Sequence, residues 1–191
     1  LNGTIDHNLV NNAQWDGIKL VNSDGTDVTY NTVNNALLSG IALFDSDDSS
    51  VSNNTVNNSG TEGIHSGNND RLTISNNTVN TTGLNFGFEG HGIWHHSSDD
   101  ATITGNTVND AEVDGIAVWG LGVSAFGANL IGNNDVFSAG RDGIAAYYST
   151  CVTISNNDDT VGTGVKGSGN NGIGVYGSHG TVVAGNDVDD S

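Results

Sequence analysis

Proline and methionine are absent from this 191-residue sequence, cysteine occurs once, and Lys and Arg together number 4 against 22 Asp and Glu. The formal net charge of −18 excludes a basic nucleic-acid-binding protein, because neutralising phosphates requires clustered Lys and Arg side chains. No stretch approaches the ~18 consecutive apolar residues of a membrane-spanning helix. The single thiol, Cys151, can form neither an internal disulfide nor a metal cluster by itself.

The low aromatic content and the 28 glycines would indicate disorder if they were distributed without a pattern. Instead, the dipeptide Gly-Ile recurs every 23 to 29 residues, with its glycines at Gly17, Gly40, Gly63, Gly92, Gly115, Gly143 and Gly172. A second column consists of Asn8, Asn31, Asn54, Asn77, Asn106, Asn134, Asn157 and Asn186. An Ile or Val lies three residues before each of these asparagines, and a Val lies two residues after all but Asn157, where Asp159 takes its place. The chain is therefore a tandem repeat.

Each repeat holds three short β-branched segments separated by turns rich in Asn, Gly, Asp and Ser. One such unit cannot close a core alone, whereas stacked units bury a continuous one. We therefore predict a single all-β domain over residues 1–191, a β-solenoid of about eight coils that forms three parallel sheets with strands ~4.8 Å apart. The asparagine column predicts an internal Asn ladder, because Asn tolerates the left-handed backbone of a tight corner and its amide can bond to the Asn above and below.

Three segments carry a family resemblance: LTISNNTVN (72–80), ATITGNTVND (101–110) and DGIAAYYSTCVTISNND (142–158). They resemble the right-handed parallel β-helix proteins of the pectin-lyase-like superfamily, and look most like the coils of alginate (mannuronan) epimerases, polysaccharide lyases and bacterial surface proteins. The resemblance covers essentially the whole chain and implies a right-handed parallel β-helix that acts outside the cell or at its surface. It implies less about activity, because this scaffold hosts unrelated functions.

Side chains alternate across a strand, so the residues two and four positions after each repeated glycine should face outward. The first of these columns contains Lys19, Ala42, His65, Trp94, Ala117, Ala145 and Gly174, and the second contains Val21, Phe44, Gly67, His96, Trp119, Tyr147 and Tyr176. Immediately before the glycines stand Asp16, Ser39, Glu62, His91, Asp114, Asp142 and Asn171. Aromatic rings beside ionisable groups suit sugars, which stack by their apolar faces and bond through hydroxyls. The predicted polysaccharide-binding residues are Trp94, Trp119, Tyr147, Tyr176, Asp114 and Asp142.

The same residues also have plainer interpretations. The rings can pair across neighbouring strands, which is worth ~0.2–1 kcal/mol for each pair. Asp114 and Asp142 can serve as turn formers, and His95 is expected to point inward or cap a turn. Three insertions, 81–91, 120–129 and 163–171, adjoin the sheet, and insertions in a solenoid often border its binding face. The family resemblance implies a cleft along this sheet and the loop that precedes it.

The enzymatic hypothesis is a polyuronate lyase or epimerase. Both reactions remove the proton next to a uronate carboxylate, and they need a base, an acid and a group that neutralises the carboxylate. The acid and base candidates are His65, His91, His96, Tyr147 and Tyr148, and the neutralising candidates are Lys19, Arg71, Arg141 or Ca²⁺. The Asp-Pro-His signature of the epimerases cannot occur without proline, and EGHGI (89–93), which is similar to the Gly-His-Gly of polygalacturonases, is not followed by their Arg-x-Lys. A polyanionic substrate would also meet a protein of charge −18.

The competing hypothesis is a non-catalytic surface adhesin, matrix or filament module. The repeat runs in mid-unit to Leu1 and Ser191 without an obvious cap, so we expect more chain or another subunit to continue the stack. Unprotected solenoid ends invite strand addition, which predicts head-to-tail self-association.

An acidic column stands seven residues before the asparagine column, at Asp24, Asp47, Asp70 and Asp99. Carboxylates ~4.8 Å apart repel by roughly 0.9 kcal/mol in bulk water, so a solvated stack is tolerable. Ca²⁺ would relieve this repulsion through its preference for oxygen ligands, and it is the cofactor that the column predicts. Neither an EF-hand loop nor a Gly-Gly-x-Gly-x-Asp nonapeptide occurs in the sequence.

Overall fold

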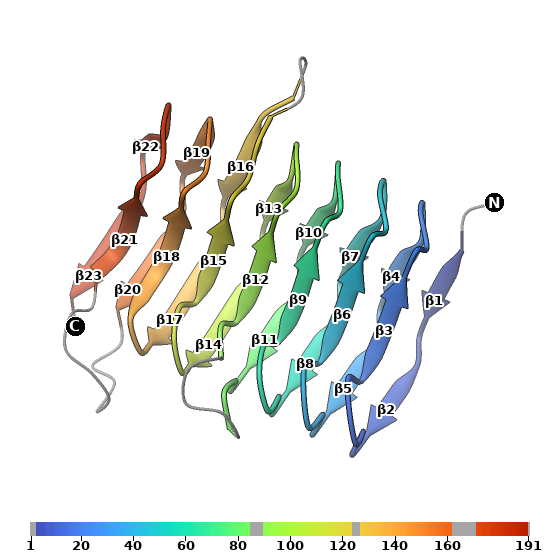
Figure 1. Ribbon diagram of the computed structural model, residues 1–191. Helices are drawn as coiled ribbons and strands as arrows, with labels where there is room; N and C mark the ends of the chain where they lie inside the picture. Colours follow the sequence, from blue (N-terminus) through green and yellow to red (C-terminus); the bar gives the residue numbers. More distant parts are fainter. Residues whose placement is uncertain (1–2, 85–89, 124–126, 162–170, 191) are drawn as a thin grey trace.

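The computed structural model describes residues 3–84, 90–123, 127–161 and 171–190. These residues form 23 short strands in three parallel sheets, and among them no helix is long and apolar enough to cross a membrane. Two sheets have eight strands and the third has seven, which confirms the predicted all-β solenoid of about eight coils. Figure 1 shows the rungs stacked one after another from the blue N-terminal end to the red C-terminal end.

Successive strands along the chain go to the three sheets in turn. The first sheet contains β1 (Thr4–Asp6), β4 (Asp27–Thr29), β7 (Ser50–Ser52), β10 (Thr73–Ser75), β13 (Thr102–Thr104), β16 (Asn129–Gly132), β19 (Val152–Ser155) and β22 (Val182–Ala184). The second contains β2 (Leu9–Asn11), β5 (Thr32–Asn34), β8 (Thr55–Asn57), β11 (Thr78–Asn80), β14 (Thr107–Ala111), β17 (Asp135–Ala139), β20 (Asp158–Val161) and β23 (Asp187–Asp190). The third contains β3 (Ile18–Val21), β6 (Ile41–Phe44), β9 (Ile64–Gly67), β12 (Ile93–His96), β15 (Ile116–Trp119), β18 (Asp142–Tyr147) and β21 (Asn171–Tyr176).

The isoleucines that follow the repeated glycines face the interior, as predicted. Ile18, Ile41, Ile64, Ile93, Ile116, Ile144 and Ile173 pair with one another along the third sheet. The five in the middle have no exposed surface. Equivalent columns in the other two sheets, such as Ile74 and Val79 in one rung, are also fully buried. The three columns together make one continuous core, as expected for stacked units that cannot close a core singly.

The predicted asparagine ladder runs through the interior. Asn77 is representative: its Oδ1 accepts hydrogen bonds from the backbone N–H and the side-chain amide of Asn54 at 2.9 and 3.0 Å. Its own amide donates to the carbonyl of Val51 at 2.9 Å and to Oδ1 of Asn106 at 3.0 Å. The expectation that the ladder residue itself has a left-handed backbone is wrong. The positive φ lies one residue earlier, as at Asn76 (φ 56°), where the chain turns the corner from β10 to β11 and leaves the next side chain pointing inward.

A close approach between sheets explains the glycines of the Gly-Ile column. A Cβ on Gly92 would lie 2.2 Å from Cγ1 of Val108 and 2.5 Å from the carbonyl oxygen of Gly115. Gly40 and Gly63 show the same approach, with a valine of the second sheet 2.2 Å from the added atom. No side chain fits at these positions, so the column fixes how the second and third sheets meet.

The outward columns of the third sheet have the predicted register, but their small residues do not reach solvent. Trp94 pairs with His65 and Ala117, and His96 pairs with Trp119. Ala42 and Ala117 lie in the outward column yet are only 1% exposed, because their short side chains are covered by larger neighbours such as His65 and Trp94. The outer surface of this sheet is therefore made by its long side chains.

Candidate functional site

A row of rings covers the outer face of the third sheet. Its members, here called the aromatic face, are Phe44, His65, Trp94, His96, Trp119, Tyr147 and Tyr176. They lie in two neighbouring outward columns, because parallel strands in register stack the same position rung upon rung: His65 and Trp94 are in one column and the other five rings are in the second. The ring centroids of His65 and Trp94 lie 4.7 Å apart with planes at 13°, and those of Tyr147 and Tyr176 lie 4.9 Å apart with planes at 9°.

The rings pair with one another and also keep exposed surface. Trp119 contacts Tyr147 at a centroid distance of 5.6 Å, within the range of stabilising aromatic pairs. Trp119 is nevertheless 47% exposed and Tyr176 is 37% exposed, while Trp94 is half-buried. Cross-strand pairing is therefore present, and the same rings still offer surface on which a ligand can stack.

A polar cluster lies at one edge of the aromatic face, around the buried carboxylate of Asp114. Arg141 binds this carboxylate with two nitrogens, its Nε donating to Oδ1 at 2.7 Å and its Nη2 to Oδ2. The Tyr147 hydroxyl lies 3.2 Å from Oδ2 of Asp114 and 3.3 Å from Oδ2 of Asp142. His91 Nδ1 lies 3.3 Å from Oδ2 of Asp114, without forming a hydrogen bond of regular geometry. These five residues are here called the Asp114 cluster.

Both aspartates also bind the backbone of the next rung, and Asp142 lies within strand β18 rather than in a turn. Oδ1 of Asp114 accepts the backbone N–H of Asp142 at 3.1 Å, and Oδ1 of Asp142 accepts the backbone N–H of Asn171 at 3.3 Å. Each carboxylate therefore holds the next rung while its other oxygen faces the hydroxyls of the aromatic face.

Burial and hydrogen bonding set the protonation of the Asp114 cluster. Burial acts to raise the pKa of Asp114, but the adjacent His91 and Arg141 groups lower that pKa overall. Burial, followed by the charge of Asp114, raises the pKa of Tyr147, and burial with a 2.8 Å hydrogen bond to Asp142 raises that of Tyr176. At neutral pH the cluster thus holds an ionised carboxylate on a guanidinium, beside two neutral phenols, those of Tyr147 and Tyr176, that can donate hydrogen bonds.

Two of the histidines predicted as acid–base groups meet on the aromatic face. The Nε2 atoms of His65 and His96 are 3.2 Å apart, and Nδ1 of His65 lies 3.6 Å from Oε2 of Glu62. Burial and then the charge of His96 lower the pKa of His65 to about 4, and burial also lowers the pKa of His96. Both imidazoles are therefore neutral at pH 7 and can accept a proton. The third, His91, belongs to the Asp114 cluster.

His95 points into the core, as expected. It has no exposed surface, and its Nδ1 lies 2.8 Å from the hydroxyl of Ser66 on the preceding rung. Its Nε2 has no hydrogen-bond partner among the described residues. Burial lowers the pKa of His95 to about 3, because a charged imidazole has no water around it there.

Acid is expected to destabilise the fold through His95. An unfolded histidine binds a proton below about pH 6.5, whereas folded His95 does so only near pH 3, so stability falls as the pH decreases through this window. At 1.36 kcal/mol per unit, the loss on going from pH 7 to pH 5 is roughly 2 kcal/mol. Urea unfolding at the two pH values measures this loss in the free energy of unfolding. The loss should be roughly 2 kcal/mol larger in the unmodified protein than in a Ser66→Ala/His95→Leu variant. Equal losses in both proteins would contradict this role of His95.

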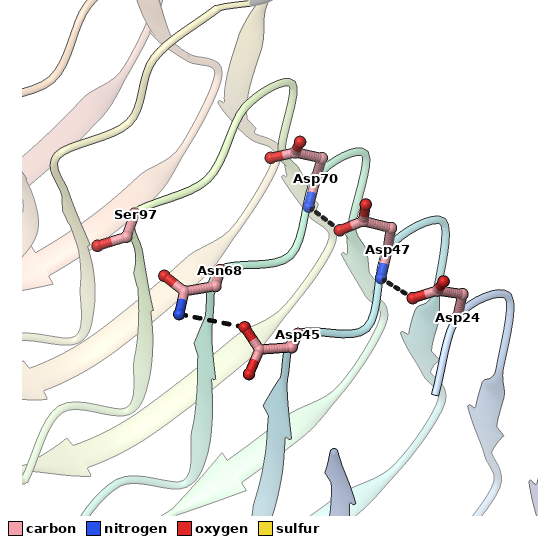
Figure 2. A pocket seen from close by; sticks show the side chains of 6 residues that line it. All are labelled: Asp24, Asp45, Asp47, Asn68, Asp70 and Ser97. Carbon is pink, nitrogen blue, oxygen red and sulfur yellow. Dashed lines mark hydrogen bonds between the residues drawn. The ribbon is translucent and has the colours of Figure 1, made fainter. Parts of the chain in front are cut away.

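The acidic column lies at the corners between the third and first sheets, just after the strands that carry the aromatic face. A hollow of about 390 Å³ beside this column is lined by six polar residues: Asp24, Asp45, Asp47, Asn68, Asp70 and Ser97. Figure 2 shows how their side chains lie. Asp24 accepts the backbone N–H of Asp47 at 2.9 Å, Asp47 that of Asp70, and Asp70 that of Asp99. The column is thus a second ladder, which gives these carboxylates a structural role. In the part of the chain that the structure describes, no group of three or more His, Cys, Asp or Glu could hold a metal ion. Calcium binding stays a prediction.

Of the three candidate cations, Arg141 belongs to the Asp114 cluster. Arg71 binds Asp48 at 2.6 Å beside the acidic column, and Lys19 binds Asp16 at 3.0 Å near the N-terminal end of the third sheet. The ring of Tyr148 contacts Trp119 at 5.1 Å and is exposed. Residues 85–89, 124–126 and 162–170 lie outside the described residues. The prediction that the three insertions border the binding face falls largely on these residues.

Several solved structures share this architecture. Tailspike protein 2 of Escherichia coli O157:H7 bacteriophage CAB120 matches with a TM-score of 0.72 and 16% identity, over 95% of this chain and 25% of that chain. The A-module of mannuronan C-5 epimerase AlgE4 from Azotobacter vinelandii matches with a TM-score of 0.59 and 12% identity, over 93% of this chain and 57% of that chain. Alginate lyase from Paenibacillus sp. str. FPU-7 matches with a TM-score of 0.51 and 14% identity, over 95% of this chain and 79% of that chain. At these identities the likeness shows the fold alone.

The chain spans a quarter of the tailspike and little more than half of the epimerase module. A comparison of the sequence with curated proteins found no match. The family described as a right handed beta helix region matches residues 1–108 and 91–191, and the two matches together span the whole chain. This match agrees with the three parallel sheets and the inward isoleucine column, and the chain therefore belongs to the right-handed β-helix family.

Proposed function

We propose that this chain binds an extended polysaccharide along the aromatic face, outside the cell or at its surface. The observation that carries the proposal is the row of partly exposed rings on successive rungs, edged by the Asp114 cluster. Sugar rings would stack on Trp94 and Trp119, and their hydroxyls would bond to the outer edge of Arg141 and to the tyrosine hydroxyls. The similarity to an alginate lyase and a mannuronan epimerase supports a polysaccharide as the class of ligand.

The catalytic form of this proposal is a polyuronate lyase or epimerase. Arg141 would face the uronate carboxylate, neutral His65 or His96 would take the proton next to it, and Tyr147 would supply a proton. The charge of −18 opposes the approach of a polyanion. Incubation with alginate and pectate, followed by ultraviolet absorbance of unsaturated products and NMR of sugar composition, tests this form. No change in either signal would reject the chemistry and leave the binding proposal in place.

The second candidate is a binding or adhesin module without catalysis. The observation that favours it is that the Asp114 carboxylate is already occupied within the cluster: it accepts hydrogen bonds from two of the three Arg141 nitrogens and from the Tyr147 hydroxyl. A guanidinium already bound in this way has fewer free donors for a uronate. Such a cluster positions the tyrosines and shapes a rigid surface, which is what a binding module requires.

Trp94→Ala and Trp119→Ala are each expected to weaken polysaccharide binding by about tenfold or more, because aromatic side chains carry much of the binding energy of such surfaces. Trp15 provides a matched control, since it is 73% exposed but lies outside the aromatic face. Affinity gel electrophoresis with alginate, pectate and a neutral glucan measures the effect, and thermal unfolding checks the fold. If both variants are retarded by the polysaccharide gel as strongly as the unmodified protein, the aromatic face is not the binding surface. The same conclusion follows if only Trp15→Ala loses binding.

A further inference from the structure

A separate pocket of about 210 Å³ lies at the N-terminal end of the aromatic face. Its lining includes Asp16, Lys19, Ser39, Phe44, Glu62 and His65, from β3, β6 and β9 and the residues just before these strands. Its volume is below the roughly 300–1,000 Å³ of sites for drug-sized ligands, and it suits one sugar residue at the end of a longer chain.

Glu62 contributes a buried carboxylate to this pocket. The residue is 2% exposed, and its Oε2 accepts a hydrogen bond from the Ser39 hydroxyl at 3.2 Å. Its Oε1 has no partner among the described residues. The terminal torsion of a glutamate is broad, so a rotation about it can turn the unpartnered oxygen toward the pocket. A buried carboxylate oxygen without a donor is costly, and a ligand that brings a donor would remove that cost.

The charge of Glu62 is not balanced by its neighbours. The nearest basic group is His65, whose Nδ1 lies 3.6 Å away, and burial keeps the pKa of His65 near 4, so the imidazole is neutral. The one ammonium of the pocket, on Lys19, is paired with Asp16 at 3.0 Å. The pocket therefore has two carboxylates and one cation, and it lacks one positive charge.

The ring of Phe44 completes the pocket. The Nζ of Lys19 lies 5.6 Å from the centroid of the Phe44 ring, a cation–π distance, and the edge of His65 meets the same ring at 4.9 Å. The pocket thus already accommodates an ammonium group beside an aromatic ring. A ligand hydroxyl would supply a hydrogen bond but no charge, and a uronate carboxylate would add to the repulsion.

We infer that this pocket binds a sugar residue that carries a protonated amine, at one end of a polysaccharide lying on the aromatic face. The ammonium donates to the Glu62 carboxylate and supplies the missing positive charge, while the sugar ring lies against Phe44. The net charge of −18 attracts a cationic polysaccharide over longer distances. This inference rests on the proposed polysaccharide binding and adds to it the class of sugar.

Calorimetric titration with a glucosamine tetramer and with its fully N-acetylated counterpart tests the inference. The free-amine tetramer should bind at least tenfold more tightly, or about 1.4 kcal/mol. Glu62→Gln, which keeps the shape and the acceptor for Ser39, should abolish this preference. Asp135→Asn is the matched control, because it removes one negative charge from an exposed position on β17 and should preserve the preference.

Equal binding of the two tetramers by the unmodified protein would overturn the inference, and this comparison requires no variant. A preference that survives in Glu62→Gln, or that disappears equally in Asp135→Asn, would also overturn it, the latter by showing general charge attraction. If the protein shows no preference for the free amine but binds the acetylated tetramer or another polysaccharide through Trp94 and Trp119, this inference fails and the proposed function stands. Absence of binding by every sugar would reject both.

Discussion

Replacing Gly92 with alanine is expected to destabilise the protein by on the order of 3 kcal/mol or more. The added methyl would lie 2.2 Å from Cγ1 of Val108 and 2.5 Å from the carbonyl oxygen of Gly115. The carbonyl belongs to the backbone of the next rung and cannot rotate away, so the rungs themselves must separate. Overpacking that shifts side chains and backbone typically costs ~1–3 kcal/mol and occasionally more. We expect the upper end here because two contacts are shorter than 3 Å and one of them is to backbone. Equilibrium unfolding in urea measures the change.

Gly120→Ala is the matched control for this substitution. Gly120 has a φ of 62°, and nothing lies within 4 Å of an added Cβ, so the variant bears only the roughly 1–2 kcal/mol cost of a left-handed backbone. If both variants unfold at the same urea concentration, the close approach of the second and third sheets at the Gly-Ile column is not as described.

Removing the Asp114 side chain by substitution with alanine is expected to cost about 3 kcal/mol. The change leaves the backbone N–H of Asp142 without an acceptor and the Arg141 guanidinium without its partner, and it leaves the Tyr147 hydroxyl with Asp142 as its only acceptor among the described residues. Breaking a fully buried ion pair costs ~3–5 kcal/mol, and the value here is at the low end because the Arg141 side chain is 47% exposed and can turn to water. Thermal and urea unfolding provide the measurement.

Asp114→Asn separates charge from hydrogen bonding at the same position. It keeps an acceptor for Asp142 and should lose less stability than the alanine variant. Since neighbouring groups lower the pKa of Asp114 below 3.8, the stabilisation is complete above that pH and is lost only on further acidification. The difference between the unmodified and alanine proteins should therefore be the same at pH 5 and pH 8. A difference that changes strongly in this range, or alanine and asparagine variants of equal stability, would contradict the description of the Asp114 cluster.

The register of the solenoid could be predicted because it depends on periodicity alone. Once Ile93 was aligned with Ile64 and Ile116, the alternation of side chains placed Trp94 outward and His95 inward, and the structure confirms both. The Asn77 ladder followed from the same alignment. In a tandem repeat, aligning one column correctly also aligns the neighbouring positions of each repeat and so predicts which side chains face inward.

Contacts between rungs could not be predicted from the same alignment. Asp114 and Arg141 are joined although they come from different columns and different rungs, and the pairing depends on the direction of a long side chain. The neutrality of His65 likewise depends on how deeply its neighbours bury it. The left-handed residue before each ladder asparagine was assigned one position too late, because composition does not distinguish Asn76 from Asn77. The sequence did contain one signal for the pocket at Glu62 that the site prediction did not use: Glu62 occupies the same position before Gly-Ile as Asp114, which was predicted to bind the ligand.

The indole N–H signals in a proton–nitrogen NMR spectrum would test the polysaccharide-binding surface most directly. The protein has 3 tryptophans, and single alanine variants would assign their signals. During titration with an oligosaccharide that the protein binds, the signals of Trp94 and Trp119 should shift together and that of Trp15 should stay still. A spectrum in which Trp15 alone moves, or in which all three indoles remain unchanged at saturation, would contradict the account.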